Sequence, residues 1–447
     1  MKRIVILGAA ESGVGAAILA QKQGYEVFVS DMGVIKANYK EELDRYGLAW
    51  EEGQHTPALI LNADEVIKSP GIPETAPMIM SLRAKGIPVI SEIEFAARYT
   101  DAKMICITGS NGKTTTTTLI HFILKNAGFN VGLAGNIGHS LALQVAEEQH
   151  DYYVIELSSF QLDGMYKFRA NVAVLMNITP DHLDRYNFCM QNYVDSKMRI
   201  LRNQQAEDTF IYWKQDEYID KELPKYPVKA AVCPFADSPR AEISGAVDKG
   251  VLTLTAPVAF EMPIADIKIT GKHNYRNAMA AAMATLAAGA SVEDVRRGLA
   301  EFPGVEHRLE PVAVVDGVHY VNDSKATNVD ACYCALDSMT TPTVLIVGGK
   351  DKGNDYSQIM ALVREKCRAL VYLGADNNKL HASFDHLGLP VADTHTMADC
   401  VAACAKLAQK GDTVLLSPCC ASFDLFKNME DRGEQFKDNV LKINSEA

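Results

Sequence analysis

The chain has 447 residues, 48% of them hydrophobic and 22% charged, with a formal net charge of −12 at pH 7. This length is too great for one hydrophobic core and predicts about three domains. The negative charge, with no basic tract to offset it, excludes nucleic acid as an expected partner. No apolar run is long enough for a membrane span or a signal peptide, and the ten cysteines include no Cys-x-x-Cys pair. We therefore expect a cytoplasmic protein with reduced thiols that acts as a monomer away from membranes.

The first predicted block begins with a strand over residues 4–7, a turn, a helix and a strand over residues 26–30 that ends before Asp31. The turn residues that would face a ligand are Gly8, Ser12 and Gly13. This order resembles a dinucleotide-binding fingerprint, in which glycines admit a diphosphate and an acid binds a ribose. Ala10 stands where the middle glycine is expected. That substitution disfavours NAD and favours a nucleotide-sugar or diphosphate site, with a purely structural turn as the alternative.

Residues 92–99 read as a short helix and a bridge, which places a domain boundary near residue 97. The second block then opens with a β-branched run over residues 104–108, a loop and a helix. The loop residues expected to surround phosphates are Gly109, Asn111, Gly112, Lys113, Thr114 and Thr115. Glycines and a helix N-terminus present N–H groups to a phosphate, Lys113 reaches the terminal phosphates, and the Thr114 hydroxyl can ligate Mg²⁺. The spacing is shorter than in the usual P-loop, so we interpret it as a variant; the alternative is an ordinary glycine-rich turn.

Polar side chains follow the strands of this block, where parallel sheets bind ligands. Glu156 closes the strand over residues 152–156 and is well placed to hold Mg²⁺, with a solvated carboxylate as the alternative. His182 follows the next strand between two acids, where it can act as a ligand or as an oriented donor. Helical spacing predicts that Lys197 faces solvent. The other polar residues of these loops and of a later helix are Asn136, Ser158, Asn274 and Asn277.

The stretch over residues 205–265 is rich in proline, and its run over residues 251–255 predicts an antiparallel insertion at the sheet edge. The third block begins after Pro303. Its predicted strands cover residues 318–321, 343–347, 369–373 and 413–416. The loops after these strands carry Lys325, Thr327, Lys352 and Ser422. We expect these side chains to converge on a rim that suits a small anionic substrate, including one with more than one carboxylate.

These features predict an α/β protein of three domains. Residues 1–97 form a Rossmann-like domain. Residues 98–302 form a central parallel sheet of the P-loop ATPase type with a small antiparallel insertion. Residues 303–447 form a second Rossmann-like domain.

Taken together, the motifs closely resemble those of the Mur ligase family, the ATP-dependent amide-forming enzymes of bacterial peptidoglycan synthesis. The matching segments are Thr108-Gly-Ser-Asn-Gly-Lys-Thr-Thr115, Glu156-Leu-Ser-Ser159, residues 177–184, His273-Asn-Tyr-Arg-Asn277 and Glu306-His-Arg-Leu309. The resemblance covers essentially the whole chain. Within the family, the segments 322–328 and 417–422 look most like those of the D-glutamate-adding members.

The resemblance implies a role for each candidate residue. Lys197 would carry CO₂ as a carbamate, which reverses the expectation from helical spacing. Thr114, Glu156, His182 and the carbamate would hold two Mg²⁺ ions. The residues expected at ATP are Asn274, Asn277, Arg308 and Asp323, with Lys325 near the γ-phosphate. The residues expected at D-glutamate are Thr327, Lys352, Ser422 and Phe423. Residues 8–15 and Asp31 would hold the UDP group. Met32 and Met429 depart from the family pattern, at the uracil site and the D-glutamate site respectively.

The implied reaction is ATP-dependent addition of D-glutamate to UDP-N-acetylmuramoyl-L-alanine through an acyl phosphate. The alternatives are a related ligase for another amino acid, a plain P-loop ATPase, and a regulator that binds NAD or another nucleotide. The last two predict no turnover that depends on D-glutamate.

Overall fold

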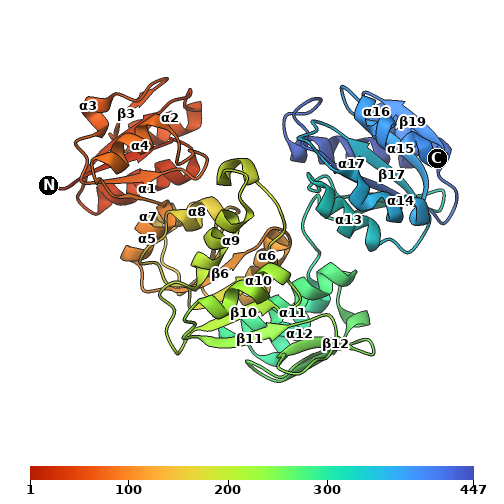
Figure 1. Ribbon diagram of the computed structural model, residues 1–447, viewed down its shortest axis with the longest axis horizontal. Coiled ribbons are helices and arrows are strands. Elements are labelled where there is room, and N and C mark those ends of the chain that lie inside the picture. Colours follow the sequence, from red (N-terminus) through yellow and green to blue (C-terminus); the bar gives the residue numbers. More distant parts are fainter. Residues whose placement is uncertain (447) are drawn as a thin grey trace. The chain divides into compact units, whose positions relative to one another are not determined.

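The computed structural model describes residues 1–446, which form two compact units. The first unit comprises Met1–Ile269 and Asn274–Phe302, and the second comprises Thr270–His273 and the chain from Pro303 onward (Figure 1). The described residues contain three separate sheets, two in the first unit and one in the second. The predicted α/β class is confirmed. The predicted domain boundaries at residues 97 and 302 stay a prediction.

The first sheet has five parallel strands in the order β3-β2-β1-β4-β5. Ile4 and Ile6 face the side of helix α1, whereas Val5 and Leu7 pack on the opposite side with Ile60, because successive residues of a strand point to opposite faces. The strands are β1 Arg3–Leu7, β2 Glu26–Asp31, β3 Ala49–Glu52, β4 Glu65–Lys68 and β5 Val89–Ile90. The helices are α1 Glu11–Lys22, α2 Ala37–Arg45, α3 Pro57–Ile60, α4 Pro77–Ala84, α5 Glu92–Ala96 and η1 Ala97–Tyr99. The predicted helical stretch over residues 92–99 is confirmed, whereas β3 was not predicted.

The second sheet has nine strands in the order β14-β13-β12-β11-β10-β9-β6-β8-β7. The strands from β11 to β7 are parallel, and β12 to β14 form an antiparallel edge, as the sequence predicts. The strands are β6 Lys103–Thr108, β7 Val131–Gly135, β8 Tyr152–Glu156, β9 Val172–Leu175, β10 Thr209–Trp213, β11 Ala231–Phe235, β12 Gly245–Asp248, β13 Val251–Leu254 and β14 Phe260–Pro263.

Helices α6 and α12 pack together beside this sheet, and α11 is a long Ala-rich helix that is buried over most of its length. The helices are α6 Lys113–Asn126, α7 Leu141–Glu147, α8 Ser159–Asp163, η2 Leu183–Tyr186, α9 Met190–Met198, η3 Arg199–Leu201, α10 Glu217–Glu222, η4 Leu223–Lys225, η5 Ile264–Asp266, α11 Lys272–Ala287 and α12 Val292–Glu301. The P-loop is the connection between strand β6 and helix α6.

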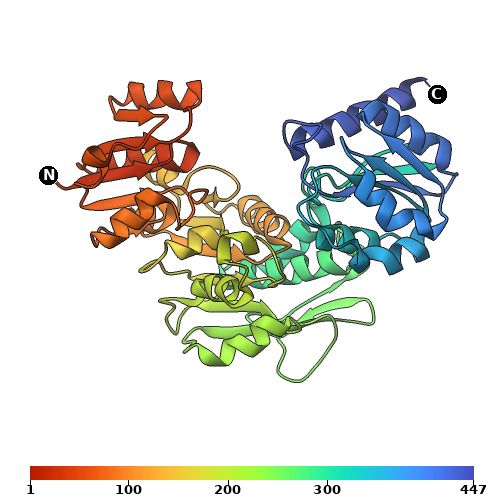
Figure 2. The same cartoon turned by 45° about the horizontal axis from the view of Figure 1, so that its top comes forward.

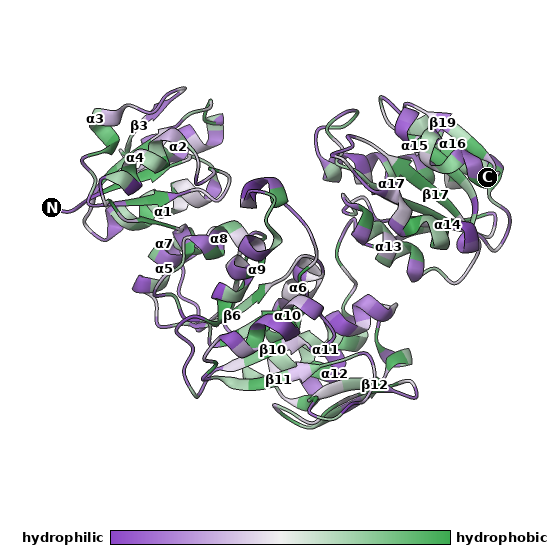
Figure 3. Ribbon diagram, in the orientation of Figure 1, coloured by the Kyte–Doolittle hydropathy of each residue, from purple (hydrophilic) through white to green (hydrophobic). Residues whose placement is uncertain are grey.

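The third sheet, in the second unit, has the order β15-β16-β20-β17-β18-β19, with β15 antiparallel at one edge. Figure 2 shows this unit in teal and blue, with helices on both sides of its sheet. Leu345 and Val347 pack against α13 and α14, whereas Val344 and Ile346 pack against α16 and α17. This alternation buries both faces of β17, whose ribbon is hydrophobic in Figure 3. The strands are β15 Glu310–Val315, β16 Val318–Asn322, β17 Thr343–Gly348, β18 Cys367–Leu373, β19 Val391–Thr394 and β20 Thr413–Cys419. The helices are α13 Val329–Asp337, η6 Tyr356–Ile359, α14 Met360–Lys366, α15 Asn378–Phe384, η7 Asp385–Leu387, α16 Met397–Leu407 and α17 Met429–Glu446.

Among residues 1–446, no helix combines the length and the apolar character that a membrane crossing would require.

Candidate active site

The loop between β6 and α6 has the geometry of a phosphate-binding loop. Gly109 and Gly112 have φ angles of +147° and +83°, which side chains other than hydrogen rarely allow. A Cβ atom at Gly112 would lie 2.6 Å from Asn277 Oδ1, so space also requires glycine there. Lys113 Nζ lies 2.8 Å from the carbonyl oxygens of both Gly109 and Ser110, which holds its charge over the loop. The loop thus presents a cation and the N-terminus of α6 at one place.

Glu156 is the buried acid of this site. It is 1% exposed and ends β8, which pairs with β6. Its Oε1 accepts a hydrogen bond of 2.8 Å from Asn136 Nδ2, while Oε2 is buried without a hydrogen-bond partner. An unpartnered buried carboxylate oxygen is costly unless a cation or donor satisfies it. Because oxygen ligands suit Mg²⁺, the residues present fit a bound magnesium ion, with the Thr114 hydroxyl on the adjoining helix turn.

Lys197 lies inside the protein, so the expectation from helical spacing that it faces solvent is wrong. The side chain on α9 is 2% exposed, and Nζ donates to Thr108 Oγ1 at 3.1 Å and to the Gly109 carbonyl oxygen at 2.9 Å. The helix α9 packs against α8, and the Lys197 side chain reaches the end of β6, so tertiary contacts override the surface pattern of the helix. Burial, together with the charge of Lys113, holds the pKa of Lys197 well below its usual value. The amine beside the phosphate loop therefore gives up its proton at a lower pH than an ordinary lysine does.

His182 stands at the start of η2 with a left-handed backbone (φ +51°). Its Nε2 lies 3.6 Å from Asp181 Oδ2, and more than half of its side chain is exposed (54%). Partial burial and the charges of Lys113 and Lys197 lower the pKa of His182, against the opposing effect of Asp181. The imidazole is therefore available as a neutral ligand or base at neutral pH.

Two asparagines of α11 approach the phosphate loop. Asn277 Nδ2 donates to Asn274 Oδ1 at 3.1 Å, and Asn277 Oδ1 accepts from Thr116 Oγ1 at 3.3 Å. Both side chains are buried. Ser158, by contrast, is the N-cap of α8 and forms a capping box with Gln161. The contacts of Ser158 are those of a helix terminus.

The predicted UDP residues gather at the carboxyl end of β1 and β2. Gly8 has φ +94°, and a Cβ atom at Gly13 would overlap the Gly8 carbonyl oxygen, so α1 requires glycine to pack this closely. The oxygens of Asp31 accept hydrogen bonds from the backbone N–H groups of Ala9 (2.7 Å) and Gly33 (2.8 Å). Asp31 thus also holds the two loops, a role that its sequence position did not indicate. Ser12 lies in the first turn of α1.

A cavity of about 600 Å³ opens beside these residues. Gly8, Asp31, Met32 and His55 line it together with apolar side chains of the segment 71–79. Met32, which departs from the family pattern, is 59% exposed and offers the cavity an apolar wall. The volume and the apolar lining suit an aromatic base with part of its sugar.

In the second unit, Asp323 is the buried acid of the candidate site. It is 2% exposed, its Oδ1 accepts from the Leu309 N–H at 3.2 Å, and its Oδ2 accepts from Ser417 Oγ at 2.9 Å. Burial raises the pKa of Asp323 to about 6. Arg308 lies between two residues with left-handed backbones, His307 (φ +60°) and Leu309 (φ +45°), and its Nε is buried without a hydrogen-bond partner.

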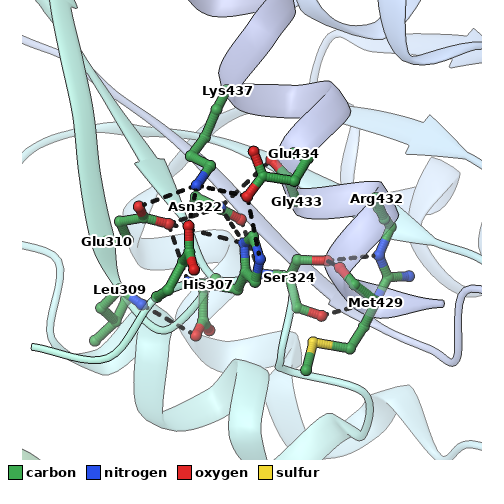
Figure 4. Close-up of polar contacts among 12 residues, drawn as sticks. His307, Leu309, Glu310, Asn322, Ser324, Met429, Arg432, Gly433, Glu434 and Lys437 are labelled. Atoms are coloured by element: carbon green, nitrogen blue, oxygen red, sulfur yellow. Dashed lines mark hydrogen bonds and ion pairs between the residues drawn. The ribbon is translucent and has the colours of Figure 1, made fainter.

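A buried polar cluster holds this Arg308 turn against α17 (Figure 4). Asn322 Nδ2 donates to His307 Nδ1 at 2.9 Å, which assigns Nδ1 as the acceptor because the amide nitrogen can only donate. Gly433 packs so closely that a Cβ atom would overlap the His307 ring. Lys437 pairs with the carboxylates of Glu306, Glu310 and Glu434. Since this ammonium is shared by all three acids around His307, we interpret the cluster as structural.

The predicted amino-acid residues lie on three loops that contact one another. The Lys350 N–H donates to the Ala421 carbonyl oxygen at 2.8 Å, which joins the loop of Lys352 to the loop of Ser422. The Lys325 N–H donates to the His307 carbonyl oxygen at 3.0 Å. Ser422 is buried, whereas Thr327, Lys352 and Phe423 are exposed.

Arg432 of α17 also belongs to this region and was missed by sequence reasoning. It is 1% exposed and donates to Ser324 Oγ, to the Ser324 carbonyl oxygen and to the Cys420 carbonyl oxygen. It thereby links the loop of Lys325 to the loop of Ser422. An Asp-Arg-Gly sequence within a polar helix carried no signal of this burial.

Comparison with known proteins agrees with this geometry. Residues 3–78 match the MurD N-terminal domain, residues 107–285 the Mur ligase middle domain, and residues 307–420 the Mur ligase glutamate ligase domain. The chain is 64% identical over 444 residues to the UDP-N-acetylmuramoylalanine–D-glutamate ligase of Bacteroides thetaiotaomicron, covering 99% of this chain and 100% of that protein. It is 55% identical over 445 residues to the ligase of the same name from Porphyromonas gingivalis, covering 98% of each.

Among solved structures, MurF ligase from Thermotoga maritima in complex with ADP shares the fold. Its TM-score is 0.62 at 16% identity, with 100% of this chain and 99% of that chain covered. The phosphate loop, the buried acid and lysine beside it, and matches to all three characteristic domains lead to one conclusion: the chain belongs to the Mur ligase family.

Proposed function

We propose that this protein joins D-glutamate to UDP-N-acetylmuramoyl-L-alanine in a reaction driven by ATP. The main structural support for this function is the arrangement of side chains at the phosphate loop. The buried Glu156 Oε2 has no hydrogen-bond partner among residues 1–446, and the buried Lys197 amine donates to the Gly109 carbonyl oxygen. In a chain of the Mur ligase family, this arrangement fits an ATP and magnesium site. The identity to relatives named for D-glutamate addition supports the choice of amino acid.

Each of three regions binds one of the three substrates. Residues 1–97 bind the UDP part of the substrate, and the cavity beside Gly8 and Asp31 supports this assignment. Residues 98–302 bind ATP, with Gly109, Asn111, Gly112, Lys113, Thr114 and Thr115 around the phosphates. Residues 303–447 bind D-glutamate.

The reaction has two steps. The substrate carboxylate attacks the γ-phosphorus of ATP, the bond to the β-phosphate oxygen breaks, and an acyl phosphate and ADP form. The amine of D-glutamate then attacks the acyl carbon, loses a proton, and releases phosphate as the amide forms. Lys113 and Lys325 neutralise charge on the transferring phosphoryl group. When His182 is not coordinated to magnesium, its imidazole, whose pKa is lowered, is suited to take a proton from the amine.

Magnesium, when bound, neutralises phosphate charge and orients the oxygens of the transferring group. We assign its ligands to Thr114, Glu156 and His182, with a carbamate on Lys197 serving a second ion. The buried, unpartnered oxygen of Glu156 supports the first assignment.

The carbamate requires a neutral amine. Lys197 Nζ would attack the carbon of CO₂ and lose one proton, which converts the side chain into an anion with two ligand oxygens. Its lowered pKa supports this chemistry because only the unprotonated amine is a nucleophile. Lys197→Ala should be inactive, and small carboxylates such as formate should restore part of the activity. Absence of rescue at any concentration would count against the carbamate.

The remaining residues are assigned to the adenosine part of ATP and to the two other substrates. For the adenosine part of ATP we propose Asn274, Asn277, Arg308 and Asp323. For UDP-N-acetylmuramoyl-L-alanine we propose Gly8, Ser12, Gly13, Asp31, Asn136 and Ser158. For D-glutamate we propose Thr327, Lys352, Ser422 and Phe423, and the contacts that join their three loops support this grouping.

The experiment compares amino acids. The purified protein is incubated with Mg²⁺, ATP and UDP-N-acetylmuramoyl-L-alanine plus D-glutamate, L-glutamate or meso-diaminopimelate, and the products are identified by mass. A product with D-glutamate alone is expected. A product with another amino acid would retain the family and overturn the pocket. Phosphate release without any product would favour a plain ATPase, and binding of nucleotide without turnover would favour a regulator.

A further inference from the structure

The loop that carries Lys352 is organised by one carboxylate. Asp351 Oδ1 accepts hydrogen bonds from the backbone N–H groups of Gly353 (2.6 Å) and Asn354 (3.1 Å) and from Lys379 Nζ (2.8 Å). Asp351 Oδ2 accepts from the Tyr356 hydroxyl at 2.8 Å. Since Lys352 lies inside this turn and is itself exposed, its position depends on how firmly Asp351 is held.

Tyr356 connects this carboxylate to the loop that carries Ser422. Its hydroxyl lies 3.2 Å from Cys420 Sγ. The single hydroxyl hydrogen of Tyr356 is used toward Asp351, so the thiol hydrogen of Cys420 must point to the Tyr356 oxygen. Burial raises the pKa of Cys420 to about 11, so the thiol keeps this hydrogen at neutral pH. The result is a directed chain from Cys420 through Tyr356 to Asp351.

Two further contacts tie the same loops together. Asn354 Nδ2 donates to the Cys419 carbonyl oxygen at 3.0 Å and approaches Cys420 Sγ at 3.3 Å. The ring of Tyr356 is 4% exposed and packs 5.4 Å from the ring of Phe384, so its place in the core does not depend on the hydroxyl. The hydroxyl is therefore the part of the residue that joins the loops, whereas the ring stabilises the fold.

We propose that Tyr356 is a positioning residue that sets Lys352 relative to Ser422 and thereby determines the affinity for the amino-acid substrate. This inference rests on the proposed function, because it takes Lys352 and Ser422 as ligands of the same amino acid. Tyr356 acts through Asp351 on one loop and through Cys420 on the other. It does not itself contact the substrate.

The test removes only the hydroxyl, in Tyr356→Phe. The matched control is Tyr372→Phe, which removes a hydroxyl in the same core. That hydroxyl donates to Asp385 Oδ1 at 3.1 Å and hydrogen-bonds to neither loop within residues 1–446. In Tyr356→Phe the KM for D-glutamate should rise about fivefold, while kcat and the KM for ATP change less than about twofold, as expected for one lost hydrogen bond. Tyr372→Phe should leave all three constants unchanged.

Variants of Cys420 separate the hydrogen bond from the side-chain volume. Cys420→Ser keeps a donor and should retain a KM for D-glutamate close to that of the original protein, whereas Cys420→Ala should reproduce the rise. A double variant of Tyr356→Phe and Cys420→Ala should raise the KM no further than either change alone, because both break the same chain. Full additivity of the two effects would overturn the proposal.

Hydrogen exchange tests the loop without any turnover. The amides of Gly353 and Asn354 donate to Asp351, so Tyr356→Phe should speed their exchange about fivefold and Tyr372→Phe should not. Unchanged exchange overturns the proposal, and so does faster exchange with an unchanged KM for D-glutamate. If the unaltered protein shows no turnover with D-glutamate, the proposed function fails, and the exchange result alone decides whether Tyr356 holds the loop.

Discussion

Replacement of Lys197 by methionine should abolish activity without destabilising the protein. Methionine has a similar length and needs no hydrogen bond in the buried position that Lys197 occupies. The two acceptors that lose the lysine keep other partners: Thr108 Oγ1 still donates to the Leu157 carbonyl, and the Gly109 carbonyl still accepts from Lys113 Nζ. No polar group is therefore orphaned, and the loss is limited to about 1 kcal/mol for each of two hydrogen bonds.

Lys197→Met gains stability because the variant no longer buries an ionisable amine. Its folded pKa lies well below the unfolded value, so at pH values between the two the unfolded chain binds more protons at this site than the folded chain does. Each unit of lowering costs the folded state about 1.4 kcal/mol at pH values below both pKa values. This cost fades as the pH rises toward about 10.4, where the unfolded lysine also loses its proton. Lys197→Met should thus be at least as stable as the original protein at pH 7, with an advantage that shrinks toward pH 10.

The assay is urea unfolding at pH 7, 8, 9 and 10 in buffers freed of CO₂, together with ligase turnover in the presence of bicarbonate. The matched control is Lys229→Met, since Lys229 is exposed in the same unit. Turnover of Lys197→Met should fall at least about 100-fold, because a charged ligand is lost at the reacting phosphate. A variant that is less stable by the same amount at every pH, or one that turns over at a near-normal rate, would refute the reasoning.

Three further predictions concern groups with defined contacts. Lys113→Ala should reduce turnover by at least about 100-fold through loss of charge at the phosphates, and near-normal phosphate release would contradict the P-loop assignment. Glu156→Gln should weaken Mg²⁺ binding about tenfold or more, as measured by calorimetry, because a neutral amide replaces the carboxylate with the unpartnered oxygen. Unchanged binding would show that other residues hold the metal. Asp323, with a pKa raised to about 6, binds a proton more tightly when folded, so stability should fall by up to about 3 kcal/mol as the pH rises from 4 to 6. Asp323→Asn should lack that slope in unfolding curves, and an identical slope in both proteins would assign it to other groups.

The sequence predicts the parts of this site that depend on neighbours along the chain. The phosphate loop lies between a strand and a helix in sequence, and Glu156 stands at the last position of a strand, so strand ends alone place them. Lys197 shows the limit of such reasoning: the helical pattern indicates a surface lysine, whereas its side chain is buried against Thr108 and Gly109, which are distant in sequence. The resemblance to the Mur ligase family reversed the expectation for Lys197, because a family motif reflects contacts in the folded protein.

Contacts between distant segments explain the residues that sequence reasoning missed. Tyr356 and Cys420 are separated by 64 positions, and Arg432 and Ser324 by 108, and their motifs carry no mark of the pairing. Asp31 was expected to bind a ribose, and its hydrogen bonds to Ala9 and Gly33 follow from loop geometry that a pattern of residue types does not encode.

The most direct test of the account follows an oxygen atom. UDP-N-acetylmuramoyl-L-alanine labelled with ¹⁸O in its terminal carboxylate is incubated with Mg²⁺, ATP and D-glutamate, and the released phosphate is analysed by mass. Because the substrate carboxylate is proposed to attack the γ-phosphorus, each phosphate should carry one ¹⁸O atom and appear in equal number with the amide product. Unlabelled phosphate, or labelled phosphate without a D-glutamate-containing product, would contradict the proposed reaction.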